Sequence, residues 1–317
     1  MLDTLLFSVN AVAPLALLMG VGMFLRWRKT LPVTFFLLAN KLAFSVLLPV
    51  MLFCNIYDCR ETTMAFDWKY VGIGVGGIFA AFILLMLLIP RICKDKTQVG
   101  VIIQDIYRSN FLVFGIPVVT NMFGEGELWT TSMLMPFVIP IFNVLAVIAL
   151  TWYITPEHGM KKVKGALIGI LKNPLIIAAI LSYVFILTRL SLPVSIYKAL
   201  TNMKDMGSPL ALIALGGTLK FSSLRKNMRP LLITCTGKLI LMPALILTVA
   251  IAAGYRGSPI GALLAMGGSP AAISSYTMAQ QTGNDGDLAG QAVVLTTIAS
   301  VATMFVWIFG LRASGIL

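Results

Sequence analysis

The distribution of apolar and polar residues divides the chain into long hydrophobic runs joined by short polar segments. A helix that crosses a bilayer needs about 20 consecutive, mainly apolar residues. The pattern predicts an all-α polytopic membrane protein, in contact with the lipid bilayer through its helices. We expect ten transmembrane helices, at residues 4–25, 34–56, 70–90, 99–122, 129–153, 166–187, 193–217, 229–254, 258–281 and 288–311.

Composition supports a membrane protein over a soluble one. Of the 317 residues, 58% are hydrophobic and 11% are charged, whereas a soluble domain carries about 25% charged residues. The mean hydropathy is +0.93. We therefore expect a multi-pass protein integral to the cytoplasmic (inner) membrane.

The net charge of +12 is explained by membrane topology better than by nucleic acid, because the basic residues are scattered over short loops. Thirteen lie in loops after the first, third, fifth and seventh runs: Arg26, Arg28, Lys29, Arg91, Lys94, Lys96, Lys161, Lys162, Lys164, Lys220, Arg225, Lys226 and Arg229. Six lie on the opposite side: Arg60, Lys69, Arg189, Lys198, Arg256 and Arg312. Since cytoplasmic loops are rich in Lys and Arg, we expect both termini to be non-cytoplasmic and no nucleic-acid partner.

Residues for catalysis or metal binding are scarce. The four cysteines, Cys54, Cys59, Cys93 and Cys235, show no metal-site spacing, and the single histidine, His158, lies in a loop. No nucleotide-binding motif and no catalytic set is recognisable. We expect neither an enzyme nor a bound cofactor or metal.

The runs fall into two halves. Five precede the connecting loop at 155–165 and five follow it, giving a first repeat at 1–154 and a second at 166–317. An odd number of spans per repeat places the halves in opposite orientations, which predicts inverted repeats. The fourth and ninth runs, the fourth of each half, are interrupted by Gly and Pro.

The first interruption is Arg108-Ser-Asn-Phe-Leu-Val-Phe-Gly-Ile-Pro117. Pro117 has no N–H to offer the carbonyl of Val113, and its ring crowds that carbonyl. We expect a broken helix whose second half begins near Pro117. Its free N–H groups and positive dipole end would bind an anion beside Gly115 and Ile116.

The second interruption is Ala265-Met-Gly-Gly-Ser-Pro-Ala-Ala-Ile-Ser-Ser275, where Gly268 precedes Ser269 and Pro270. Ser269 is a good N-cap and Pro270 a good first helical residue, so we expect a half-helix to start at Pro270. Matched interruptions point to a transporter's binding site, although each alone is also typical of a proline kink. Ser274 and Ser275 either bond freed carbonyls or face the substrate.

Ionisable residues at membrane depth are functional candidates. Asp105 and Arg108, three residues apart, are expected to share a helix face and either pair or act as gating or coupling charges. Lys238, in the middle of the eighth run, is expected to face a polar interior. Lys204 and Asp205 are adjacent, so at least one needs a partner elsewhere, and Asp205 is a coupling candidate.

Two further polar residues lie in the hydrophobic runs. Asn110 lies seven residues before Pro117, about two helical turns, and therefore faces the same side. Its amide donates hydrogen bonds and suits a carboxylate, although membrane Asn also bonds neighbouring helices. Lys41, near the start of the second run, is interpreted as snorkelling or pairing locally.

These motifs resemble one family. Arg108-x-Asn110-x4-Gly115-Ile-Pro117 with Phe123-Gly124 is similar to the fourth helix of the auxin efflux carrier family, which includes plant carriers and bacterial malate and malonate carriers. Further matching segments are Lys172-Asn-Pro-Leu175, Asp205-x-Gly-x-Pro-Leu-Ala-Leu-Ile-Ala-Leu-Gly216, Lys238-Leu-Ile-Leu-Met-Pro243, Gly254-Tyr-Arg-Gly257 and Gly268-Ser-Pro-Ala-Ala-Ile-Ser-Ser275.

The resemblance implies the ten-helix fold shared with bile-acid sodium symporters. Helices 1, 2, 6 and 7 would form a scaffold, and the others a transport domain with crossover helices 4 and 9. Asn110 matches the family's carboxylate-binding asparagine. The plant carriers' long loop is absent and Ser275 stands where they tend to have proline, which favours a small organic acid over auxin.

The expected function is secondary transport of a small organic anion, such as a malate- or malonate-like mono- or dicarboxylate, by elevator-type alternating access. A sodium-coupled symporter of the bile-acid type and a transport-inactive receptor are the alternatives. Proton or sodium coupling and a homodimer remain open.

Overall fold

The computed structural model describes residues 2–58, 66–154, 174–218 and 227–317, and these residues form helices and no strand. The predicted connecting loop at 155–165, with His158, lies outside them. The helices are α1 (Leu2–Trp27), α2 (Val33–Leu42), α3 (Leu48–Asp58), α4 (Trp68–Ile92), α5 (Lys96–Tyr107), α6 (Ile116–Phe123), α7 (Trp129–Trp152), α9 (Pro174–Thr188), α10 (Val194–Thr218), α11 (Met228–Thr236), α12 (Met242–Ala252), α13 (Ser258–Gly268), α14 (Ser274–Gln281) and α15 (Gly286–Ala313).

Several of these helices are long and apolar enough to cross a membrane. Among the described residues five qualify, and α1 makes a sixth if its two bent segments count as one span. The five are Val33–Asp58, Trp68–Ile92, Trp129–Trp152, Met228–Ala252 and Gly286–Ala313. Three apolar helices are shorter: Phe111–Phe123, Ile177–Thr188 and Ser258–Gly268. The chain is thus helical and multi-pass, while the ten-span arrangement stays a prediction.

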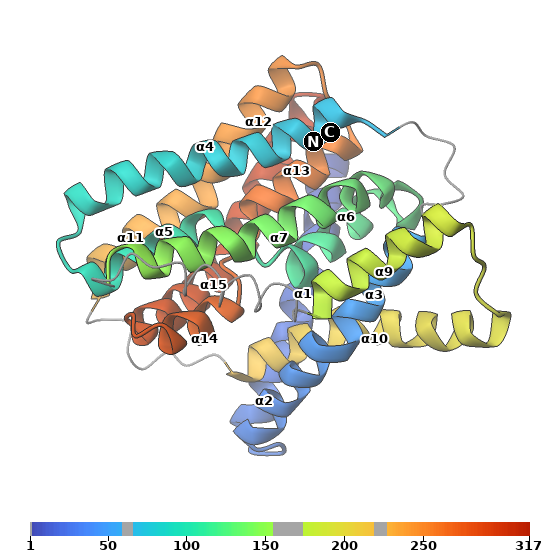
Figure 1. Ribbon diagram of the computed structural model, residues 1–317, viewed down its shortest axis with the longest axis horizontal. Coiled ribbons are helices and arrows are strands. Elements are labelled where there is room, and N and C mark those ends of the chain that lie inside the picture. Colours follow the sequence, from blue (N-terminus) through green and yellow to red (C-terminus); the bar gives the residue numbers. More distant parts are fainter. Residues whose placement is uncertain (1, 59–65, 155–173, 219–226) are drawn as a thin grey trace.

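The helices pack in two groups (Figure 1). The panel group consists of α1, α2, α3, α9 and α10, in which α10 packs against α1, α2 and α3, and α9 packs on α3. The crossover group consists of α4, α5, α6, α7 and α11 to α15, in which α5 packs against α4, α7 and α11. Helix α1 also contacts α6 and α15, so it joins the groups.

Glycines bring two helices of the panel group into close contact. A Cβ atom added at Gly22 of α1 would lie 2.0 Å from the carbonyl oxygen of Ile213, and one at Gly216 of α10 would lie 2.0 Å from that of Met19. A side chain at either position would force the helices apart. Small residues at such contacts are how membrane helices gain packing, since hydrocarbon offers little hydrophobic driving force.

In the described residues three π-turns form part of the helices, and each lies just before a proline. Ala43–Leu47 precedes Pro49, Phe111–Gly115 precedes Pro117, and Gly237–Leu241 precedes Pro243. A proline cannot donate to the carbonyl four residues earlier. The wider π-turn shifts the hydrogen-bond register, so helical structure continues through the proline. At Pro243 the carbonyl left without its usual partner, that of Leu239, accepts a bond from the Trp307 indole at 2.9 Å.

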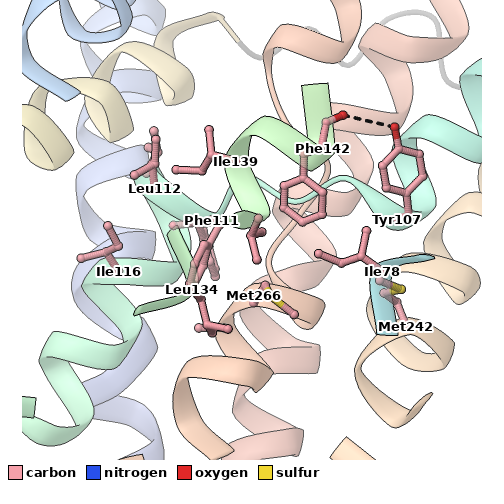
Figure 2. Close-up of a cluster of buried hydrophobic side chains, with 14 of the residues drawn as sticks. Ile78, Tyr107, Phe111, Leu112, Ile116, Leu134, Ile139, Phe142, Met242 and Met266 are labelled. Atoms are coloured by element: carbon pink, nitrogen blue, oxygen red, sulfur yellow. Dashed lines mark hydrogen bonds between the residues drawn. The ribbon is translucent and has the colours of Figure 1, made fainter. Parts of the chain in front are cut away.

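The centre of the crossover group is an apolar core (Figure 2). Tyr107, the last residue of α5, is fully buried there and donates a hydrogen bond to the Phe142 carbonyl of α7 at 3.3 Å. Leu112 and Ile116 extend from the neighbouring π-turn and α6 toward α1. This core holds the ends of the broken helices in place.

Candidate functional site

The first interrupted run breaks earlier than predicted. Helix α5 ends at Tyr107, and Arg108 is extended, with φ −86° and ψ 121°. Helical structure resumes at Phe111 and continues to Phe123. The predicted start near Pro117 is therefore wrong, because the π-turn accommodates that proline inside the second half-helix.

The second interrupted run breaks later than predicted. Helix α13 ends at Gly268, and Ser269 is its extended C-cap, with φ −61° and ψ 152°. The next helix, α14, begins at Ser274, so the predicted start at Pro270 is wrong. A residue before proline is driven out of the helical region, and the Ser269 hydroxyl bonds back to the Ala265 carbonyl at 2.5 Å. Ser269 therefore closes α13 and caps no following helix.

The two breaks lie against each other. The Asn110 N–H donates to the Pro270 carbonyl at 2.8 Å, and Ser109 pairs with Ala271 in an isolated antiparallel bridge. The Ala271 N–H donates in turn to the Thr296 hydroxyl of α15 at 3.1 Å. We call residues 108–110 with 269–273 the crossover. The N–H groups of Asn110 and Ala271 are paired although the crossover is not helical, which is what burial at membrane depth requires.

A cavity of about 820 Å³ lies between the crossover and the panel group. One wall is α2 and its π-turn, and the opposite wall is the crossover with α7 and α14. The lining residues are Leu37, Asn40, Lys41, Phe44, Ser45, Arg108, Ser109, Asn110, Phe111, Leu112, Ile139, Phe142, Asn143, Pro174, Ala272, Ile273, Ser274 and Met278. No Asp or Glu is among these lining residues, so within the described part of the chain the cavity wall is cationic.

Asn110 lines this cavity and carries a buried amide group without a partner. It directly precedes the half-helix that starts at Phe111, and its side chain is only 4% exposed. Its backbone carbonyl accepts from Phe114 at 3.0 Å, while its side-chain Nδ2 has no hydrogen-bond partner. A buried amide N–H without a partner is costly. A ligand oxygen would satisfy it at the positive end of the half-helix.

Arg108 contributes a positive charge to the same wall. Its guanidinium donates to the Asn143 side-chain oxygen at 2.7 Å and to the Met278 sulfur at 2.9 Å. Because Arg108 follows the end of α5, it does not share a helix face with Asp105, and that prediction is wrong. Both carboxylate oxygens of Asp105 are fully buried and without a hydrogen-bond partner.

Lys238 bonds to both broken runs. It is fully buried in the π-turn before Pro243, and its ammonium donates to the Ser109 hydroxyl and to the Gly267 carbonyl, the latter at 3.1 Å. It does not line the large cavity. The polar surroundings expected for Lys238 are thus the backbone and hydroxyl of the crossover region.

The remaining predicted residues divide between the crossover and a second cavity. Ser274 lines the large cavity, and the Ser275 hydroxyl is buried without a partner. Gly115 lies close to the crossover, since an added Cβ would be 3.1 Å from the Ser269 hydroxyl oxygen. Gly268 and Pro270 belong to the crossover region but do not line the cavity.

The second cavity, of about 250 Å³, is lined by residues that directly follow the π-turn Phe111–Gly115, whereas Phe111 and Leu112 of that turn line the large cavity. Ile116 and Pro117 of α6 line the second cavity, together with Lys204 and Asp205 of α10. Asp205 is exposed, whereas Lys204 forms an ion pair with Asp58 of α3 at 3.8 Å. This confirms that one of the two adjacent charges needs a partner from another helix.

Two functional candidates escaped sequence reasoning. Lys41 is exposed and lines the large cavity opposite Arg108, which the interpretation as a snorkelling or locally paired residue missed. Asn143, which orients Arg108, was not singled out. The signal for Lys41 was present, since Asn40 and Lys41 are adjacent polar residues inside an apolar run.

Comparison with known proteins places the chain among transporters. The model of the family described as "Membrane transport protein" matches residues 7–165 and 155–308. The chain is 21% identical over 310 residues to "Uncharacterized transporter YfdV" of Escherichia coli (strain K12), covering 96% of this chain and 98% of the relative. The proteins of that name from Escherichia coli O157:H7 and Shigella flexneri match to the same extent.

Proposed function

The chain belongs to the membrane transport protein family, the family of the auxin efflux carriers, and from this premise we propose that it is a secondary carrier of a small organic anion and not an enzyme. The observation that carries the proposal is the large cavity. Lys41, Arg108 and Asn110 line it, the buried Asn110 amide has an unpaired donor, and none of the lining residues is acidic. A cavity with these groups favours an anion over a cation or a neutral solute.

The proposed substrate is a mono- or dicarboxylate of about the size of malate or malonate. One carboxylate accepts hydrogen bonds from Asn110 Nδ2 and rests at the N-terminus of the half-helix that begins at Phe111. Arg108 adds charge from beside it. The hydrophobic part of the substrate contacts Leu112, Ile139 and Phe142, which also line the cavity.

The proposed mechanism is alternating access by an elevator-type movement. The panel group serves as the scaffold, and the crossover group as the transport domain that carries the substrate. Both cavities are lined by residues of the two groups; Phe111 and Leu112 line the large one, and Ile116 and Pro117 line the small one. Sliding of one group along the other closes the large cavity and enlarges the small one, which moves the substrate across the barrier at Leu112 and Ile116.

The proposed topology has ten spans in two inverted repeats in the cytoplasmic membrane, with both termini non-cytoplasmic. The loop between α1 and α2, with Arg28 and Lys29, is then cytoplasmic. Leu37 and Lys41, which line the large cavity, lie in the first third of the span Val33–Asp58 that follows this loop, so in this topology the large cavity lies on the cytoplasmic side.

Binding to the purified protein tests this proposal. Thermal-shift and calorimetric titrations with malonate, malate, lactate and a zwitterionic amino acid separate an anion site from a general polar one. We expect the organic acids to bind and to raise the melting temperature, and the zwitterion to do neither. Binding of cations or zwitterions in place of acids would contradict the proposal.

A further inference from the structure

The ammonium of Lys238 occupies a position built by both broken runs. Its ligands are the hydroxyl of Ser109, which follows α5, and the carbonyl of Gly267 in the last turn of α13. A carbonyl at a helix C-terminus carries the negative end of the helix dipole. The side chain is fully buried, so the charge is balanced by these groups and not by water.

Asp105 supplies the opposite charge. It lies in the last turn of α5, four residues before Ser109 in the sequence, and neither of its carboxylate oxygens has a hydrogen-bond partner. Lys238 and Asp105 interact electrostatically. A buried carboxylate without a compensating charge costs several kcal/mol. Lys238 therefore supplies a compensating positive charge to the surroundings of Asp105, together with Arg108.

The oxygen atoms around the Lys238 ammonium are those that bind alkali-metal ions in transporters. Unwound backbone and the C-terminal carbonyls of half-helices coordinate Na⁺ at such breaks. Here the Ser109 hydroxyl and the Gly267 carbonyl meet at one buried position, and the covalently attached ammonium fills it.

We propose that Lys238 fills a latent monovalent-cation site at the crossover, so that its ammonium takes the role that a coupling Na⁺ would otherwise have. The proposal rests on the proposed carrier function. In it, the Lys238 ammonium helps to neutralise Asp105 and links the two crossing segments during transport. The native protein then needs no Na⁺ to hold the crossover together. Removal of the ammonium exposes a site that Na⁺ can enter.

The substitution Lys238→Met tests this, because it keeps an unbranched chain and removes the charge. We expect NaCl, but not choline chloride of equal ionic strength, to raise the melting temperature of the variant by roughly 2–4 °C, the shift expected for a site at a few times its Kd. The wild type and Lys198→Met, which alters an exposed lysine of α10, should respond equally to the two salts.

The double variant Lys238→Met with Asp105→Asn is the matched charge control. It removes both members of the pair, so it should regain melting temperature relative to Lys238→Met and lose the Na⁺ response. A Na⁺-specific shift in the wild type, or none in Lys238→Met, would overturn the proposal. So would a double variant that is as Na⁺-dependent as the single one.

If Lys238→Met does not fold, a measurement on the wild type still tests the proposal. Organic-acid affinity of the wild type, titrated in NaCl and in choline chloride, should be equal, and a Na⁺ requirement for binding would also overturn the proposal. The melting experiments need no substrate. If the protein binds no organic acid, the carrier function is contradicted, but the melting experiments still test the cation site. Failure of the carrier proposal can therefore be distinguished from failure of the cation-site proposal.

Discussion

The backbone N–H of Asn110 donates to the carbonyl of Pro270 at 2.8 Å, across 160 positions of the sequence. This bond joins the two interrupted runs at the point where each leaves its helix. It also fixes the Asn110 backbone, so that the side-chain amide lies at the cavity wall with its Nδ2 group unpaired. The pairing between the breaks thereby positions the group that we assign to the substrate.

Substitution of Asn110 should weaken substrate affinity. A hydrogen bond to a charged group contributes about 1.5–3 kcal/mol, and each 1.4 kcal/mol is about tenfold in affinity. We expect Asn110→Ala to weaken organic-acid binding by about ten- to a hundredfold, measured by calorimetry. The melting temperature should change little, since Nδ2 has no protein partner to lose. Asn110→Asp should bind more weakly still, because it places a negative charge against the anion.

If Asn110 serves only to hold neighbouring helices together, the result is different. Both variants would then melt at lower temperature, while the folded fraction would bind the organic acid with unchanged affinity. Measuring affinity and melting temperature on the same preparations separates these two roles.

Lys41 should distinguish dicarboxylates from monocarboxylates. It lies on the α2 wall of the cavity, opposite the crossover wall that carries Arg108 and Asn110. A substrate with two carboxylates can reach both walls, whereas a monocarboxylate engages only one. We expect Lys41→Gln to weaken malonate binding by about tenfold or more and lactate binding by less. Lys198→Gln, an exposed lysine outside the cavity, is the control, and an equal loss for both acids would contradict this role.

Loss of the Thr296 hydroxyl should destabilise the crossover. Thr296 accepts from the Ala271 N–H at 3.1 Å, and valine has the same shape without the oxygen. Leaving a buried N–H unpaired costs about 1–3 kcal/mol, so Thr296→Val should lower the melting temperature. Thr303→Val, also in α15, removes a hydroxyl bonded within its own helix and should cost clearly less. Equal losses for the two variants would argue against a role for Thr296 at the crossover.

The sequence was sufficient to locate the breaks but not to define their ends. The Gly/Pro interruptions correctly identified the two runs that meet, since a break is possible only where the backbone is repaired by partners. The exact boundaries depend on those partners. Pro117 is absorbed by a π-turn, and Ser269 bonds Ala265 of its own helix. Neither feature can be predicted from residue type alone.

The same limit applies to the charged residues. A buried charge at membrane depth could be inferred for Lys238, whereas its ligands Ser109 and Gly267 come from segments far away in the sequence. Arg108 was paired with Asp105 on the assumption of an unbroken helix, and the end of α5 at Tyr107 invalidates that assumption. Lys41 lines the cavity because α2 packs so that it faces the crossover, and this packing could not be predicted from the sequence.

Acid should weaken a contact outside the membrane-spanning helices. Burial favours the protonated form of Asp67, but hydrogen bonds from the Tyr255 hydroxyl at 2.7 Å and the Tyr70 N–H at 2.9 Å outweigh it and lower the pKa of Asp67 below its usual value. Burial and the bond to Asp67 raise the pKa of Tyr255 to about 12. The contact is therefore intact at neutral pH.

A group with a lowered pKa stabilises the fold above its unfolded-state pKa, and this contribution is lost as the pH falls through its folded-state pKa. For Asp67 the loss begins below about pH 4. We expect the melting temperature of the wild type to fall more steeply between pH 5 and pH 3 than that of Tyr255→Phe, which lacks the bond. Parallel pH profiles would contradict the assignment.

The most direct test of the central claim is transport itself. Purified protein in proteoliposomes loaded with unlabelled malonate should accumulate labelled malonate by exchange, and Asn110→Ala should do so only at much higher substrate concentration. We predict that uptake by the wild type exceeds uptake by empty liposomes and saturates with substrate. In Asn110→Ala, the substrate concentration at half-saturation should be much higher. Binding of malonate without any uptake, or uptake that Asn110→Ala and Lys41→Gln leave unchanged, would contradict a carrier that works through this cavity.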